Sequence, residues 1–432
     1  MKKLSLPSRL LATAAVAAAV AAAVAACATD NGDSVHGPQF GPPPERPEAG
    51  GGEGAAPVEG GSADGGGGAD TGADGAQAVT CTSGTVVVLA GNDTTLTGAA
   101  QSKGAAWSGG AIAGGAAKST PAVVALGGGF VGLTRGPSDA LQSVSFATSW
   151  SGVTAVGSIT TIGSPALAAL GTKGHGVYLS GAAPTAGDIN KFFRVETSGT
   201  VFTTAGDPVM PNAGTQSFGP SAGTLASAGT DLACAQAGDD EGLYVQKRDT
   251  GWSAAAPITG AGTFNTVPPS LLAVDGKLDL VLLFADNTTN HVIGYATRDG
   301  TTKAWNNAVV TQGMARTSEQ LSVARISQAV VLVAFRGNNA RPYFMTGTLP
   351  SAASTASGGA STIAWSAPAP LLADTSTVDA APAIAKGVCG DDAIAVFGSA
   401  GQVKATRYRG GVWTAPEPVV GAAGGRISVA TR

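Results

Sequence analysis

The stretch from residue 381 to residue 420 contains APAIA (381–385), AIAVFG (393–398), VKATRYRGG (403–411) and VWTAPEPVV (412–420). These four short apolar runs are separated by turns rich in Gly and Asp, which is typical of four successive β-strands. Variants of the same four runs recur back to about residue 79. This repeat decides the fold that we expect.

The first run of each unit is the clearest marker of the repeat. It occurs at residues 121–126, 165–170, 220–225, 269–274, 320–324, 382–385 and 426–430. The fourth run opens with an aromatic residue and a small polar residue, as in Trp107-Ser, Phe202-Thr, Trp252-Ser, Trp305-Asn, Trp365-Ser and Trp413-Thr. The second unit departs from this pattern, because it has Val153-Thr there and Trp150 slightly earlier. The mean spacing of roughly 50 residues is the period of four-stranded propeller blades.

The two ends of the repeat region hold incomplete units. Residues 79–115 supply runs two to four, whereas the missing first run lies at Ile427-Ser-Val-Ala430. We therefore predict an all-β fold over residues 78–432: a seven-bladed β-propeller of four-stranded blades, closed by the C-terminal strand in the N-terminal blade. The alternatives, an open β-solenoid or two β-sandwiches, would not need the C-terminus to complete the first unit.

Two segments precede this region. Residues 1–27 have a charged start and an Ala-rich apolar run that ends in Val24-Ala-Ala-Cys27, which resembles the lipobox of a bacterial lipoprotein signal peptide. The resemblance implies that Cys27 is lipidated, and Ala28 then favours the outer membrane where the envelope has two membranes. An ordinary secretory signal or an uncleaved anchor are the alternatives.

Residues 28–77 consist mainly of Gly, Ala, Pro, Asp and Glu, so we expect a disordered tether. The tether holds most of the acidity of a chain whose net charge is −4, and the folded part is left nearly neutral. Near-neutrality argues against nucleic acid as a partner.

Ring closure would also bring together two cysteines. Cys81 and Cys389 lie in the turns between the first and second runs of the first and last blades, and an oxidising envelope compartment would permit a disulfide between them. Cys234 falls inside a buried-looking strand and is expected to be an inert packed thiol.

The repeat resembles the blades of bacterial fucose-binding propeller lectins and, more loosely, of sialidase-type propellers. The features that carry the resemblance are the openings Thr120-Pro-Ala, Ser164-Pro-Ala and Ala381-Pro-Ala, the ends Thr134-Arg-Gly and Phe335-Arg-Gly, and the hairpin into Trp-Ser. In such lectins a blade tends to carry an Asp-Gly turn followed by a sugar contact. The resemblance implies sugar contacts near Thr297-Arg-Asp-Gly300, Lys247-Arg-Asp-Thr-Gly251 and Thr406-Arg-Tyr-Arg-Gly410.

Our candidate ligand-binding residues come from these polar hairpins and from the aromatic positions after them. They are Arg248, Asp249, Trp252, Arg298, Asp299, Trp305, Arg407, Tyr408, Arg409 and Trp413. Two interpretations stay open for each kind of residue. The Trp side chains either stack on sugar faces or pack blade against blade, and the charged side chains either bind a ligand at the blade rim or are solvated turn residues.

No catalytic, metal or cofactor motif stands out. Glycoside hydrolysis needs two facing carboxyl groups, and no pair is singled out among Glu196, Glu241, Glu319 and Glu417. His175 and His291 are isolated in the sequence, and Asp391-Asp392 is better interpreted as a solvated turn than as a calcium ligand.

We therefore expect a non-catalytic binding lipoprotein of the bacterial cell envelope, monomeric and lipid-anchored, that recognises glycans. A propeller that docks envelope proteins and a diverged sialidase-like glycosidase are the alternatives.

Overall fold

The computed structural model describes residues 84–102, 105–181, 192–208, 223–238, 241–248, 251–262, 267–274, 276–287, 291–306, 309–310, 315–351, 362–388 and 390–432. The predicted signal peptide, lipidation site and tether, both cysteines of the predicted disulfide and Asp249 lie outside these residues. Among the residues described, no helix has the length and apolar character needed to cross a membrane.

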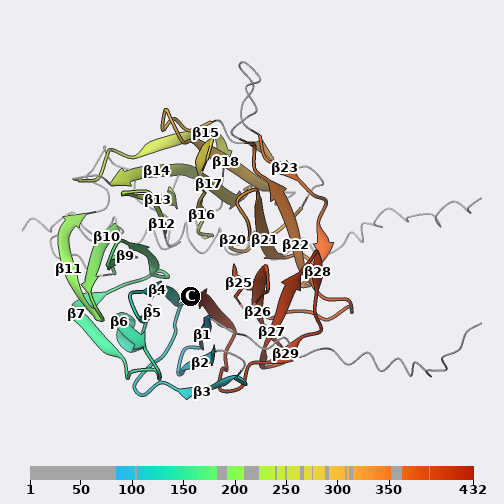
Figure 1. Cartoon of the computed structure of the whole chain (residues 1–432). Helices are drawn as coiled ribbons and strands as arrows, with labels where there is room; N and C mark the ends of the chain where they lie inside the picture. Colours follow the sequence, from blue (N-terminus) through green and yellow to red (C-terminus); the bar gives the residue numbers. More distant parts are fainter. Residues whose placement is uncertain are drawn as a thin grey trace, which may run out of the picture. The chain divides into compact units, whose positions relative to one another are not determined.

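The strands form seven antiparallel sheets arranged in a ring, which confirms the predicted propeller (Figure 1). Blade 1 consists of β30 (Arg426–Thr431), β1 (Thr85–Gly91), β2 (Leu96–Ser102) and β3 (Ser108–Ala111), and blade 2 of β4 (Ala122–Leu126), β5 (Gly129–Arg135), β6 (Ala140–Phe146) and β7 (Thr154–Thr160). Blade 3 consists of β8 (Ala166–Leu170), β9 (Lys173–Leu179), β10 (Phe192–Ser198) and β11 (Val201–Pro208), and blade 4 of β12 (Thr224–Ala228), β13 (Asp231–Ala237), β14 (Gly242–Arg248) and β15 (Ala256–Gly262).

The last three blades vary in their outermost strand. Blade 5 consists of β16 (Ser270–Ala273), β17 (Leu278–Ala285), β18 (Ile293–Asp299) and the short β19 (Val309–Val310). Blade 6 consists of β20 (Ser322–Arg325), β21 (Val330–Arg336), β22 (Pro342–Thr348), β23 (Ala364–Trp365) and β24 (Ala369–Pro370), and blade 7 of β25 (Ala383–Lys386), β26 (Ala393–Ser399), β27 (Gln402–Arg409), β28 (Val412–Trp413) and β29 (Glu417–Pro418). In these two blades a pair of two-residue strands takes the outermost place.

The ring closes as the sequence predicts. Strand β30 pairs with β1 in antiparallel register, with Val429 opposite Val88. At the end of this pair, Thr85 and Arg432 exchange two backbone hydrogen bonds of 2.9 Å. Each blade's first strand, β30 in blade 1, lies innermost and contacts the first strands of both neighbouring blades. The fold therefore joins its two ends inside one sheet.

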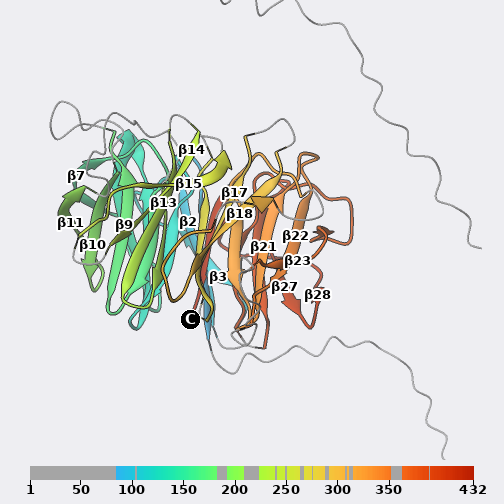
Figure 2. The same cartoon turned by 90° about the horizontal axis from the view of Figure 1, so that it is seen from above.

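Burial follows from stacking sheets face to face around an axis (Figure 2). Because both faces of a blade meet a neighbour, a second strand is apolar on both sides rather than alternating. Every residue of β17 and of β26 is buried accordingly. Cys234 lies in β13 with 2% of its surface exposed, and desolvation raises the pKa of its thiol to about 12. The prediction that Cys234 is a packed thiol is confirmed, and that it is inert stays a prediction.

Candidate functional site

An aromatic residue pairs with the last residues of the third strand in each of blades 2 to 7. Trp252 pairs with Arg248, Trp305 with Arg298 and Trp413 with Tyr408. Trp150 pairs with Phe146 in the same way. The expectation that blade 2 departs from the aromatic pattern is therefore wrong, because its hairpin is shorter and the spacing in the sequence hides the equivalence.

The small polar residue that follows the aromatic residue stabilises the blade edge through a side-chain hydrogen bond. Its hydroxyl accepts the backbone N–H of the third strand at the point where the fourth strand diverges from the ladder, and so satisfies a donor that the ladder would leave unpaired. These bonds run from Ser145 to Ser151 (3.0 Å), Lys247 to Ser253 (3.1 Å), Thr346 to Ser366 (2.9 Å) and Arg407 to Thr414 (3.1 Å). The Trp-Ser motif thus builds the blade edge.

The aromatic rings pack against the preceding blade. Trp365 of blade 6 lies edge-on to Tyr295 of blade 5 with ring centroids 5.5 Å apart, and Trp413 of blade 7 lies 5.6 Å from Phe344 of blade 6. Trp252 and Trp305 pack into the clusters that blades 4 and 5 share with the blades before them. The structure thus supports the packing role for the Trp series.

Blades 7 and 1 meet at a group of polar residues that we call the seam cluster. It contains Asp391, Arg407, Arg409 and Glu417 of blade 7 and Gln101 and Trp107 of blade 1. Arg407 in β27 and Glu417 in β29 lie on the face of blade 7 that meets blade 1, since Ala405 is directly opposite Glu417 and packs in the core shared by these two blades. The first and last blades therefore form this cluster together.

Hydrogen bonds link the seam cluster into one network. Arg407 donates from Nη1 to Asp391 Oδ2 at 2.7 Å and from Nη2 to Glu417 Oε1 at 3.1 Å, and it also contacts the amide oxygen of Gln101. Glu417 Oε1 accepts a second bond, at 2.9 Å, from the indole N–H of Trp107. Arg409 pairs with Asp391. A guanidinium, a carboxylate, an amide and an indole ring thus converge between two blades.

The ion pairs of the seam cluster favour the charged form of Arg407. Burial alone would lower the pKa of the Arg407 guanidinium, but its bonds to Asp391 and Glu417 outweigh burial and raise that pKa above its ordinary value. The Asp391 side chain is 1% exposed, whereas that of Glu417 is 42% exposed and reachable from solvent. Because Asp391 is an ion-paired buried group, its interpretation as a solvated turn residue is wrong.

The remaining predicted site residues are not gathered at one place. Arg298 is buried and binds Asp279 through two bonds of 2.8 Å, and Lys303 binds the same carboxylate at 2.7 Å. Burial opposes ionisation of Asp279, but the bonds from Arg298 and Lys303 outweigh it and lower the pKa. Tyr408 is also buried. These residues do not project at the rim, because a strand between two blades buries both of its faces.

Asp299 has the turn role that the sequence left open. Its Oδ1 accepts the backbone N–H groups of Thr301 (2.9 Å) and Thr302 (2.7 Å), and the bonds to Thr302 and Thr301 lower the pKa of the carboxyl group. Arg248 lies near His175 of blade 3, where its charge helps to lower the pKa of the imidazole. The predicted candidate residues therefore divide between turn, packing and seam-cluster roles.

Sequence reasoning missed a second polar cluster, around His175. This side chain is 5% exposed, and its Nδ1 lies 3.3 Å from Nη1 of Arg194, which also donates to Glu196 at 2.7 Å. Since a guanidinium can only donate, Nδ1 accepts and the imidazole is neutral. Desolvation, followed by the charge of Arg194, lowers the pKa of His175 to about 4. The histidine is isolated in the sequence but not in space.

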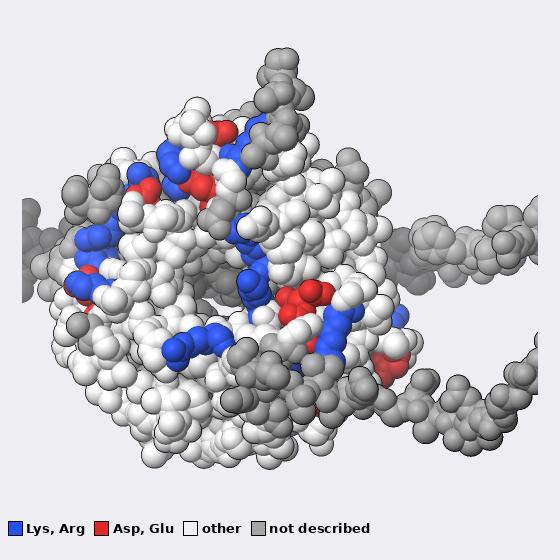
Figure 3. Space-filling model, viewed as in Figure 1, with Lys and Arg blue, Asp and Glu red and all other residues white. Residues whose placement is uncertain are grey.

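Charged side chains are scattered over one face of the propeller. On the face shown in Figure 3, Lys and Arg side chains and Asp and Glu side chains form small groups separated by broad uncharged areas. Among the described residues, no three His, Cys, Asp or Glu side chains are grouped as a metal site would require.

Comparison with solved structures finds other chains with a similar fold. The BP39L lectin from Burkholderia pseudomallei is similar over 79% of this chain and 96% of its own, with a TM-score of 0.59 and 14% sequence identity. The SapL1 lectin in complex with alpha methyl fucoside matches with a TM-score of 0.47 and 13% identity, over 72% of this chain and 98% of its own. The six-bladed fucose-recognising lectin of Aleuria aurantia has a TM-score of 0.43 and 16% identity, over 70% of this chain and 96% of its own. At 14% identity the likeness to the BP39L lectin shows the fold alone. No protein-family model and no curated protein sequence matches the chain.

Proposed function

We propose that this protein is a non-catalytic glycan-binding propeller whose binding site is the seam cluster. The observation that carries the proposal is the meeting of Arg407, Glu417 and Trp107 at one interblade junction. A guanidinium donates to sugar hydroxyls and a carboxylate accepts from them, while the indole N–H of Trp107, a buried residue, holds that carboxylate in place. The lectins that share the fold support carbohydrate as the class of ligand.

Solvent access favours Glu417 as the first residue to meet a sugar. Its carboxylate is partly exposed and already held in place by Arg407 and Trp107, so little side-chain freedom is lost on binding. Asp391 lies behind Arg407 and is almost fully buried, so it positions the guanidinium rather than contacting a ligand. Glu417 and Asp391 therefore have different roles in the proposed site.

A glycan array tests the proposal. Residues 78–432 are applied to fucosylated and neutral unsulfated glycans, beside the variants Glu417→Gln and Glu241→Gln. Glu241 is an exposed carboxylate that binds Asn287 at 2.6 Å, and it serves as the matched control. We expect binding that falls at least ten-fold in Glu417→Gln and persists in Glu241→Gln. Silence across the array, or equal binding by both variants, overturns the glycan site.

The anchoring part of the proposal rests on the sequence alone. Lipidation at Cys27 would fix the propeller to the bacterial envelope, with the tether as spacer. Labelling of the expressed protein with radioactive palmitate, with Cys27→Ala as the control, tests this. Label that persists in Cys27→Ala contradicts lipidation at this residue.

A further inference from the structure

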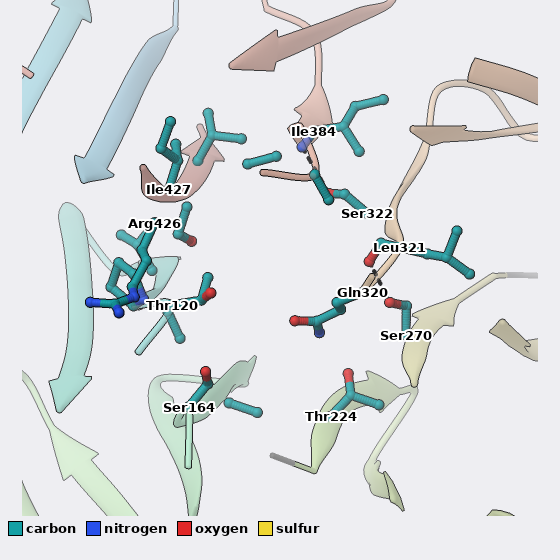
Figure 4. Close-up of a pocket in the computed structure, with 18 of the residues that line it drawn as sticks. Thr120, Ser164, Thr224, Ser270, Gln320, Leu321, Ser322, Ile384, Arg426 and Ile427 are labelled. Carbon is teal, nitrogen blue, oxygen red and sulfur yellow. Dashed lines mark hydrogen bonds between the residues drawn. The ribbon is translucent and has the colours of Figure 1, made fainter. Parts of the chain in front are cut away.

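The propeller axis holds a cavity of about 410 Å³ at the end where the inner strands begin (Figure 4). A strand at the inner edge of a blade pairs on one side only, so its free edge faces the axis. The cavity wall is therefore made of the residues that open each inner strand, one set from each blade. No residue of the seam cluster lines it.

Polar side chains line the cavity over five consecutive blades. Thr120, Ser164, Thr224, Ser270 and Gln320 come from the openings of blades 2 to 6, and they surround the hollow in Figure 4. Ser270 donates its hydroxyl to the backbone oxygen of Leu321 at 2.5 Å and so links blades 5 and 6.

Most of these polar groups have no partner. Within the part of the chain that the structure describes, the side chains of Thr120, Ser164, Thr224 and Gln320 make no hydrogen bond to protein. All four are half-buried. Half-buried donors and acceptors that converge on a hollow are groups that a bound molecule could pair.

Blades 7 and 1 complete the wall with apolar groups. Pro382 and Ile384 come from the opening of β25, and Ile427 comes from β30; all three are buried. Apolar residues such as Pro121 also line the part of the wall from blades 2 to 6, and Ser428 lines the part from blade 1, so polar and apolar groups are mixed around the wall.

The charged residues at the cavity are already neutralised. Glu319 pairs with Arg336 and accepts the backbone N–H of Ala381 at 2.8 Å. Arg426 donates to Asp93 and to a backbone oxygen, each at 2.5 Å, and its guanidinium points away from the hollow in Figure 4. A charged ligand would therefore find no free countercharge among the described residues that line the cavity.

We infer that the axial cavity is a second binding site, which takes a neutral cyclic polyol of monosaccharide size. Such a molecule presents hydroxyl groups to the Thr, Ser and Gln side chains and C–H groups to the apolar residues of the same wall. A cavity of about 410 Å³ lies within the range of small-molecule sites, roughly 300–1,000 Å³. This inference does not rest on the glycan site at the seam.

The test uses three sugars that share a ring and differ in charge: glucose, glucosamine and glucuronate. Saturation-transfer NMR on residues 78–432 should give a saturable signal for glucose and a weaker one for both charged sugars. Thr224→Val and Gln320→Leu each remove a hydrogen-bonding group at nearly constant volume, so the affinity for glucose should fall on the order of five-fold in each. Thr348→Val, at an exposed threonine on β22, is the matched control and should bind as the parent does.

Variants of the two sites separate this inference from the proposed function. Glu417→Gln should retain glucose binding at the cavity, whereas the cavity variants should retain binding to the glycan array. Glucose binding that disappears in Glu417→Gln and survives in the double variant Thr224→Val/Gln320→Leu places the sugar at the seam and overturns the inference. The absence of any saturable signal means that the cavity holds water only, which also overturns it. If Thr224→Val lowers the melting temperature, Ser164→Ala replaces it in the comparison.

Discussion

The indole nitrogen of Trp107 in the first blade donates a 2.9 Å hydrogen bond to the carboxylate of Glu417 in the last blade, 310 residues later in the chain. The same carboxylate oxygen accepts from Arg407. Among the hydrogen bonds of the described residues, this is the one in which an indole N–H donates to a charged group of another blade. This relationship ties ring closure to the proposed site.

Trp107→Phe should cost more stability than the same change at Trp150. Both residues pack a ring against the preceding blade, but the indole N–H of Trp150 has no acceptor among the described residues. Trp107→Phe also removes the hydrogen bond to Glu417. It should therefore lower the free energy of unfolding by about 1 kcal/mol more than Trp150→Phe does. Urea unfolding of both variants measures the difference. Equal losses would show that the bond contributes nothing.

Asp391→Asn should destabilise the fold strongly. The Asp391 carboxylate is buried and pairs with Arg407 and Arg409, so the change leaves two cations with too little countercharge. We expect a loss of about 3 kcal/mol. Asp299→Asn is the control, because Asp299 is exposed and the amide oxygen of Asn can still accept the turn N–H groups. A thermal melt of Asp391→Asn that matches that of Asp299→Asn would contradict the prediction.

Gly98→Ala should be poorly tolerated for steric reasons. A Cβ at Gly98 would lie 2.3 Å from the indole nitrogen of Trp150, well inside contact distance. Overpacking of this kind costs about 1–3 kcal/mol. Gly110→Ala is the matched control in the same blade, since a Cβ there meets nothing within 4 Å. Chemical denaturation should separate the two variants, and similar midpoints would show that the indole moves aside.

His175 should make stability depend on pH between about 6.5 and 4. Its pKa falls from 6.5 in the unfolded chain to about 4 in the fold, so in this window the unfolded chain binds a proton that the fold does not. The contribution of neutral His175 is complete above pH 6.5 and is lost as the pH falls toward 4. The total is on the order of 3 kcal/mol.

Denaturation midpoints at pH 7.5, 5.5 and 4.5 measure this dependence. In His175→Gln the slope across this window should flatten, since Gln does not titrate. An unchanged slope would assign the pH dependence to other groups.

Removal of β30 should open the ring. A chain that ends at Gly425 leaves β1 as an unpaired inner edge and exposes the apolar surface that Ile427 and Val429 cover. We expect aggregation or a broad, non-cooperative melt, checked by size-exclusion chromatography and circular dichroism. A monomer with the melting temperature of the full chain would show that closure is dispensable.

The architecture could be predicted from the sequence because each blade repeats the same pattern of apolar runs and turns. Runs such as residues 382–385 and 393–397 recur with turns between them, and Ile427–Ala430 supplies the one run that the first unit lacks. Strand β30 confirms this inference. A local sequence pattern is sufficient to predict the fold when every blade packs in the same way.

The candidate site could be predicted only in part. Arg407 and Arg409 were found from their hairpin, whereas Asp391, Glu417 and Gln101 join them through long-range contacts. Ring closure was the available signal, because it makes residues of the first and last blades neighbours. The prediction that Arg298 lies at the blade rim was wrong. A charged residue near a turn is usually exposed to solvent, but Arg298 is buried and forms an ion pair with Asp279.

The pairing of β30 with β1 also sets an order of events during synthesis. The ribosome makes Thr85–Gly91 before every other strand, yet β30, which covers its inner edge, emerges only after the other six blades. Middle blades can assemble while the chain grows, but the first blade keeps an open inner edge until β30 has been made. A nascent chain therefore exposes this edge throughout the synthesis of the six blades between β3 and β30.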